Sequence, residues 1–149
     1  MMEKNFVKIR SVKDIAVFVS LIVLGGILVS LPTGLGVRIA GVSLIIVGFV
    51  LAFLLKTGYK DADTGEDYFK KEHFFKQEMK NPLLSVMTSM PEVIDLSEED
   101  KGTSIRLDVY YSNQTGLAYL QMFEFVPYEY KPCSEMQEYN LYEVKKLIK

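Results

Sequence analysis

The chain has 149 residues, a formal net charge of −2 at neutral pH, one cysteine and one histidine. This length leaves room for one small domain beside the two apolar segments described below. A lone cysteine excludes an internal disulfide, and one cysteine with one histidine is too few for a zinc site of the cysteine–histidine type. The sequence therefore predicts neither a metal site nor a cofactor.

Two uncharged apolar runs, residues 15–31 and 39–55, dominate the N-terminal part of the chain. As a helix, each run covers about 26 Å of a hydrocarbon core about 30 Å thick. A backbone in lipid must satisfy its own hydrogen bonds, so two helices are expected. A cleaved signal peptide would have a shorter apolar stretch followed by a small-residue cleavage site, which the first run lacks. The sequence therefore predicts a membrane protein with a transmembrane helical hairpin over residues 15–55.

Charge is divided unequally between the two parts of the chain. Residues 1–58 carry a net charge of +4 and residues 59–149 a net charge of −6. An acidic C-terminal part repels phosphate backbones, which argues against nucleic acid as a partner. The lipid bilayer and a protein, either another chain or a second copy, are the partners that the sequence predicts.

Most basic residues near the apolar runs lie before the first run or after the second. Four precede the first run and two follow the second, whereas the connecting turn has one: Lys4, Lys8, Arg10 and Lys13, then Lys56 and Lys60, and Arg38 in the turn. The positive-inside rule then predicts an integral inner (plasma) membrane protein with both termini in the cytoplasm. On this interpretation residues 1–14 form a cytoplasmic N-terminal segment.

Small residues recur along both apolar runs with the spacing that lets two helix backbones approach closely. The pairs Gly26–Ser30 and Gly48–Ala52 show the small-xxx-small pattern. Packing of the two helices within one chain and packing against another copy or a partner's helix both remain open. The candidate packing residues are Gly26, Ser30, Gly41, Gly48 and Ala52.

Residues 56–80 form a juxtamembrane linker in which we expect a helix from about residue 65 to 79. Its aromatic residues stand among lysines, a composition typical of a helix lying on a membrane surface. Packing of the same rings into the core of the soluble domain is the alternative. His73 falls in the middle of this segment, where a surface position is expected.

Residues 81–149 predict a small α+β domain in the cytoplasm. A short helix is expected over residues 82–88, where Pro82 suits a first helical position. Strict alternation over residues 104–112, a turn at 113–116 and an aromatic-rich segment at 117–126 predict a β-hairpin. Residues 128–131 add a short third strand after Pro127. Apolar residues at helical spacing predict a C-terminal helix over residues 139–149.

No pattern in the sequence carries a recognisable reaction. Cys133 has acidic neighbours, which would raise the pKa of a thiol and reduce its reactivity. All nine tyrosines occur at or after Tyr59, and tyrosines are common both in sheets and in protein interfaces. The candidate interface residues are Phe69, Phe74, Phe75, Tyr110, Tyr119, Tyr128 and Tyr130.

These observations predict a non-catalytic, membrane-anchored interaction module, an accessory subunit or adaptor that presents a small cytoplasmic domain. The alternative is a small membrane effector or immunity-type factor that acts by oligomerisation or by neutralising a toxin. An enzyme would require a pocket that joins His73 or Cys133 to convergent acidic residues.

Overall fold

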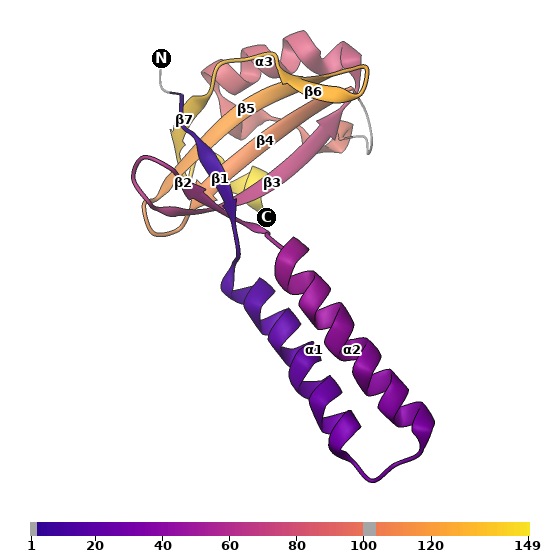
Figure 1. Cartoon of the computed structure of the whole chain (residues 1–149). Coiled ribbons are helices and arrows are strands. Elements are labelled where there is room, and N and C mark those ends of the chain that lie inside the picture. Colours follow the sequence, from indigo (N-terminus) through magenta and orange to yellow (C-terminus); the bar gives the residue numbers. More distant parts are fainter. Residues whose placement is uncertain (1–2, 100–103) are drawn as a thin grey trace. The chain divides into compact units, whose positions relative to one another are not determined.

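The computed structural model describes residues 3–99 and 104–149 (Figure 1). The chain forms two compact units. One is Val7–Tyr59, and the other joins the N-terminal residues up to Phe6 to Lys60–Lys149. The second unit is thus built from two stretches of chain that lie on either side of the first unit in the sequence.

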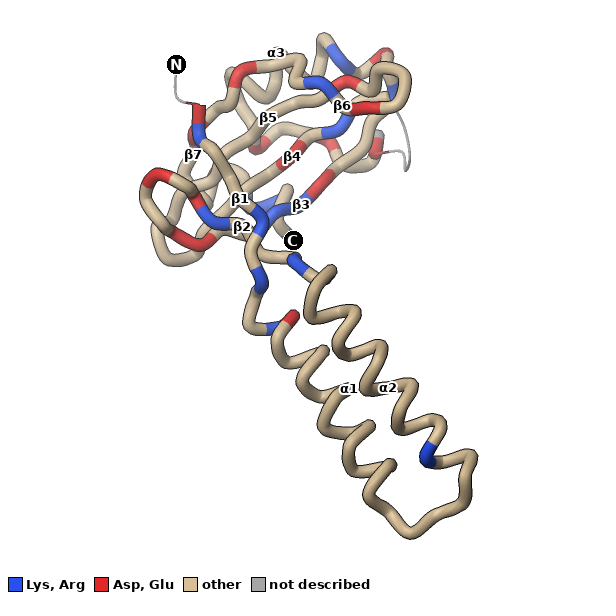
Figure 2. Tube along the Cα trace, viewed as in Figure 1, with Lys and Arg blue, Asp and Glu red and all other residues tan. Residues whose placement is uncertain are grey.

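The first unit is a pair of apolar helices, α1 (Val12–Ser30) and α2 (Leu35–Leu54). Both are long and apolar enough to cross a membrane by length and composition, and 11% of each 18-residue window is buried. Figure 2 shows charge in these helices only near the start of each one. The two-helix hairpin is therefore confirmed, and both helices begin before the predicted runs. Core helices of some soluble proteins and signal sequences have the same length and composition.

A capping box determines where α1 begins. The Ser11 hydroxyl accepts a hydrogen bond from the Asp14 backbone, and the Asp14 carboxylate accepts one from the Ser11 backbone. The same carboxylate also accepts bonds from the backbone N–H and the hydroxyl of Thr57, at 2.8 and 2.6 Å. Asp14 therefore joins the start of α1 to the chain that follows α2.

The strands of the described residues form one seven-stranded sheet. Its order is β1 (Phe6–Ile9), β2 (Gly58–Asp61), β3 (Asp67–Phe75), β4 (Ile105–Ser112), β5 (Leu117–Val126) and β6 (Glu129–Pro132), while β7 (Gln137–Asn140) also pairs with β5. Strands β3 to β7 are joined by antiparallel ladders. β6 and β7 pair with opposite halves of β5, so together they act as one interrupted edge strand.

Short helices cover one face of this sheet. They are α3 (Lys80–Ser89), α4 (Lys145–Ile148) and three single turns of 3-10 helix, Gln77–Met79, Pro91–Val93 and Leu96–Glu98. The hydrophobic core lies between these segments and the sheet. Its fully buried members are Phe75, Met87, Ile105, Leu107, Val109, Ala118, Leu120, Met122, Val144 and Leu147.

The predicted β-hairpin is confirmed as β4 and β5. Ile105, Leu107 and Val109 alternate along β4 and are fully buried, as their period of two requires. The third strand is confirmed as β6, and β5 ends just before Pro127 as expected. The predicted short helix lies within α3, which begins two residues before Pro82.

The predicted helix over residues 65–79 is wrong, because Asp67–Phe75 forms strand β3. The segment pairs with β4 in a ladder from Phe69–Tyr111 to Phe75–Ile105. Its lysines and glutamates suit a helix, but its bulky aromatic residues also suit a strand. Pairing with β4 decides between them, so the compact unit includes residues assigned from sequence to a linker.

The predicted C-terminal helix is shorter than expected. Gln137–Asn140 forms β7 against β5, and only Lys145–Ile148 is helical as α4. Val144 and Leu147 are nevertheless fully buried in the core. The apolar spacing therefore identified buried residues correctly but assigned too much of the segment to one helix.

Candidate interaction surface

The sheet presents a second face opposite the core, which we call the open face. Alternation along the strands and the cross-strand register bring polar and aromatic side chains together there. The open face comprises Lys70, Glu72 and Phe74 of β3, Arg106, Asp108 and Tyr110 of β4, Gln121, Phe123 and Phe125 of β5, and Tyr130 of β6.

A cluster of opposite charges occupies the middle of the open face. The Asp108 side chain is 1% exposed and lies 2.8 Å from the Lys70 ammonium and 2.7 Å from the Arg106 Nε atom. Lys70 also lies 2.6 Å from Glu72. Two cations and two carboxylates balance, so this cluster joins β3 to β4 without leaving a net charge for an ionic ligand.

Burial acts in opposite directions on the pKa values of Asp108 and Lys70, the two central members of this cluster. It raises the pKa of Asp108 above its usual range, despite the opposing hydrogen bond and charge of Lys70 and the charge of Arg106. For Lys70, burial acts to lower the pKa, but hydrogen bonds to Asp108 and Glu72 outweigh it and leave the pKa raised. Each group therefore depends on the other to remain charged inside the protein.

Aromatic rings gather at the end of the open face next to the β5–β6 turn. The Arg106 guanidinium lies 4.8 Å from the Phe123 ring centre and 4.5 Å from that of Tyr130. The Phe125 and Tyr130 rings are 5.2 Å apart, and Phe74 lies 6.4 Å from Tyr130. Two neighbouring rings and a cation thus hold Tyr130 in place.

The turn itself presents an aromatic side chain to solvent. Tyr128 is 99% exposed and has a φ of 77°, a backbone conformation that favours glycine. Phe125 beside it is 49% exposed. We call Phe125, Tyr128 and Tyr130 the aromatic tip.

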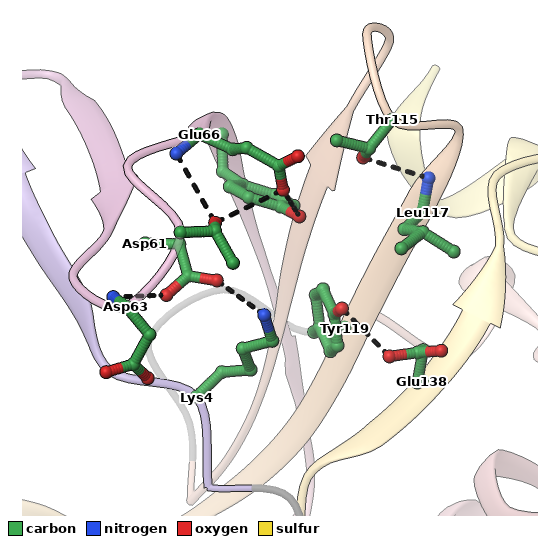
Figure 3. A network of polar contacts seen from close by, with 10 residues as sticks. Lys4, Asp61, Asp63, Glu66, Thr115, Leu117, Tyr119 and Glu138 are labelled. Atoms are coloured by element: carbon green, nitrogen blue, oxygen red, sulfur yellow. Dashed lines mark hydrogen bonds and ion pairs between the residues drawn. The ribbon is translucent and has the colours of Figure 1, made fainter.

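The N-terminal residues cover the other end of the open face (Figure 3). The Phe6 ring stacks on Tyr110 with 4.2 Å between ring centres, and it forms a T-shaped pair with Tyr68 with 5.0 Å between ring centres. Lys4 lies 2.5 Å from the fully buried Asp61, in a network with the β2–β3 turn that Figure 3 shows beside Tyr119 and Glu138. This end of the sheet is closed by the chain itself.

Tyr119 belongs to the closed end. Its hydroxyl donates a hydrogen bond of 2.8 Å to Glu138, and the residue is 2% exposed. Burial, followed by the hydrogen bond and charge of Glu138, raises the pKa of Tyr119 far above its usual value. The hydroxyl therefore stays protonated and acts as a donor that fixes β7.

The structure separates the candidate interface residues into buried and accessible groups. Phe75 and Tyr119 are buried, so their assignment to an interface is wrong; alternation along a strand, unlike the predicted helix, would have placed Phe75 in the core. Tyr110 lies under Phe6, and Phe69 is 49% exposed beside Tyr111. The remaining candidates, Phe74, Tyr128 and Tyr130, gather at or beside the aromatic tip.

Phe125 was not among the sequence candidates. Its signal was present, because it lies out of phase with the core positions of β5 and stands two residues before Pro127.

The helix-packing candidates also divide. A Cβ atom at Gly41 would lie 2.8 Å from the Gly25 carbonyl oxygen, and one at Gly48 would lie 2.6 Å from Ile22. Both glycines therefore lie where α1 and α2 are in closest contact. Gly26 has no atom within 4 Å of such a Cβ, so it does not pack against α2, and its neighbour Gly25 does. Ser30 is exposed and Ala52 half-buried.

Cys133 lines a shallow pocket of about 620 Å³ together with Lys4 and Glu135. Burial raises the pKa of its thiol, the opposite of what a nucleophile needs. His73 is buried elsewhere, bonded to Glu99 and to the Leu147 carbonyl. The surface position expected for His73 is therefore wrong, and the two residues are not brought together. Among residues 3–99 and 104–149, no three metal-ligating side chains lie close enough to hold a metal ion.

Comparison of the chain with protein-family models, with curated proteins and with solved structures finds no match to any of them.

Proposed function

We propose that this protein is a non-catalytic, membrane-anchored interaction module that presents its sheet domain in the cytoplasm to a protein partner. The aromatic tip is the proposed contact surface, and the observation that carries it is Tyr128. The ring of this residue is fully accessible, although its backbone adopts a conformation that is costly for a tyrosine.

The backbone of Tyr128 supports a role in binding. A left-handed conformation costs a non-glycine residue about 1–2 kcal/mol. Asparagine or glycine would avoid most of that cost at a turn. Exposed tyrosines that rest on rigid neighbours are frequent centres of protein interfaces because they bury a large area with few rotatable bonds. A strained, exposed ring beside Phe125 and Tyr130 is therefore better explained by binding than by stability.

Three observations support the membrane anchor and its orientation. Both helices are apolar and have 11% of their windows buried, unlike the core helix of a soluble protein. Basic residues flank the hairpin ends rather than the turn. Residues 3–6 also pack within the same unit as residues 60–149, which requires both to lie on one side of a bilayer. An even number of spans satisfies this requirement.

Site-specific photo-crosslinking of the full-length chain in its native membranes tests the proposal. A photoreactive phenylalanine analogue replaces Tyr128 in one variant and Tyr142 in the other. Tyr142 is the matched control, because it is 75% exposed and lies beside the β4–β5 turn at the other end of β5. We expect a stoichiometric crosslinked species from position 128 and none from position 142.

The Tyr128→Gly variant separates recognition from folding. Glycine accepts the φ of 77°, so the domain should keep its fold while capture of the partner, assayed by pull-down, is lost. Equal crosslinking from positions 128 and 142, or undiminished pull-down by Tyr128→Gly, would refute the aromatic tip as the contact surface. Crosslinks to a second copy only would favour the oligomerising effector instead.

The orientation has its own test in Cys133, the one cysteine of the chain. A membrane-impermeant maleimide should leave Cys133 unlabelled in intact spheroplasts and label it after permeabilisation and denaturation. Labelling before permeabilisation would reverse the proposed topology.

A further inference from the structure

His73 lies inside the domain between two hydrogen-bond acceptors. The residue is 3% exposed on strand β3. Its Nε2 atom is 2.7 Å from the backbone carbonyl oxygen of Leu147, and its Nδ1 atom is 3.2 Å from a carboxylate oxygen of Glu99. The ring therefore contacts two segments that are distant from β3 in sequence.

Both contacts are satisfied at once only when the ring is charged. A backbone carbonyl only accepts hydrogen bonds, and an ionised carboxylate also only accepts them. A neutral imidazole has one N–H group and can satisfy one of the two, whereas the imidazolium has two N–H groups and satisfies both. Because the contact to Leu147 is the shorter one, loss of a proton from Nδ1 would leave its lone pair facing the Glu99 carboxylate.

The two contacts hold two of the segments that cover the hydrophobic core. Glu99 directly follows the 3-10 turn Leu96–Glu98, and Leu147 belongs to α4. Ile94 and Leu147 are both core residues. Release of Glu99 would therefore loosen the segment that carries Ile94 while leaving α4 attached through Nε2.

The charged groups on the elements packed around His73 come from three places. Glu99 and Asp95 come from the segment around the 3-10 turn, and Asp95 lies within electrostatic range of Lys146 of α4. On β3 itself, Lys71 donates to the carbonyl oxygen of Lys149. The cross-strand partner of His73 on β4 is the apolar Leu107. Among these, Glu99 is the carboxylate that contacts the ring.

We propose that His73 is a proton-operated latch: the imidazolium fastens both α4 and the Glu99 segment to β3, and the neutral ring releases the Glu99 segment. Imidazole is the side chain whose ordinary change of charge falls between about pH 5 and 8. The inference concerns regulation of the domain and does not depend on which partner the aromatic tip binds.

The full-length chain in lipid nanodiscs provides the test. His73 is the one histidine, so an imidazole resonance in an NMR titration reports on it without ambiguity. Hydrogen exchange of peptides covering residues 90–99 and 141–149, corrected for the intrinsic pH dependence, reports on the two segments. We expect protection of residues 94–99 to fall about five- to tenfold, the scale of one hydrogen bond, with the same midpoint as the imidazole titration. Protection of residues 145–148 should change much less.

Two matched variants make the test decisive. Glu99→Gln can accept from the imidazolium and donate to the neutral ring, so protection of residues 94–99 should lose its pH dependence. Asp95→Asn removes a nearby carboxylate that does not contact the ring, so the pH dependence should persist. Protection that stays flat through the imidazole midpoint, or an equal response in wild type and Glu99→Gln, would overturn the proposal.

Discussion

The Lys4 ammonium lies 2.5 Å from the carboxylate of Asp61, which joins the chain before the first apolar helix to the turn after the second. Beside this pair, the Ala62 backbone N–H donates to the Asn5 carbonyl oxygen at 2.8 Å. Phe6 follows directly and stacks on the open face. The segments that enter and leave the helical unit are thus fixed to the same domain.

Replacing Lys4, whose side chain is 16% exposed, should destabilise the domain. In Lys4→Met, the fully buried Asp61 carboxylate keeps its backbone hydrogen bond from Asp63 but loses its cation. We expect a loss of about 2 kcal/mol in the free energy of unfolding, since one charge remains buried and unpaired. Urea unfolding in detergent, followed by tyrosine fluorescence, measures it. Lys60→Met, which breaks an exposed pair 4.0 Å long, is the control and should cost about 0.5 kcal/mol or less.

The contribution of this pair should disappear in acid. Burial acts to raise the pKa of Asp61, but the Lys4 hydrogen bond, bonds from Asp63 and Thr64 and the Lys4 charge outweigh it and hold the pKa below the usual value. A depressed carboxyl pKa contributes stability above about pH 4 and loses it as the pH falls through the folded-state value. The stability difference between wild type and Lys4→Met should therefore be constant from pH 5 to 7 and shrink below pH 4. A difference unchanged at pH 3 would contradict this assignment.

Replacing Gly41 or Gly26 by alanine should have opposite effects on the stability of the helical pair. Gly41→Ala places a methyl group 2.8 Å from a backbone oxygen of α1, so the helices must separate and we expect a loss of about 1–3 kcal/mol. Gly26→Ala enters open space and gains helix propensity of up to about 1 kcal/mol. Unfolding by increasing fractions of dodecyl sulphate, followed by far-ultraviolet circular dichroism, measures both. Equal sensitivity of the two variants would mean that α1 and α2 do not pack through Gly41.

The charge cluster of the open face should behave as a unit. Asp108→Ala leaves Lys70 and Arg106 without their shared buried carboxylate, and we expect a cost of about 3 kcal/mol. The double variant Asp108→Leu with Lys70→Met should cost at least about 1 kcal/mol less, because an apolar pair of similar size replaces the buried ions. Urea unfolding of the three proteins decides this. A double variant that costs as much as Asp108→Ala would contradict this pairing.

The parts of the fold that the sequence predicted are those where a single local pattern is decisive. The apolar helices follow from composition, and β4 with β5 follows from strict alternation around a polar turn. β3 was missed because its lysines and glutamates suit a helix, and only the ladder to β4 reveals the strand. β7 was missed because it is four residues long and depends on pairing with the half of β5 that does not pair with β6.

The candidate surface was predictable only in part, for a related reason. Tyr128 is recognisable as an aromatic residue after Pro127, but its exposure depends on the geometry of the turn. Tyr119 has the same residue type and is buried, because Phe6 and Tyr68 pack against it. Residues 3–6 approach the sheet only through the fold, and no local pattern indicates that they do.

The interleaved second unit also sets an order of assembly. Phe6 is synthesised before both apolar helices, whereas its aromatic partners on β3, β4 and β5 are synthesised after them. Residues 3–6 therefore cannot make these contacts until β5 has been made. Both apolar helices are synthesised before the sheet can close around Phe6, so an early segment of the chain takes its native place late.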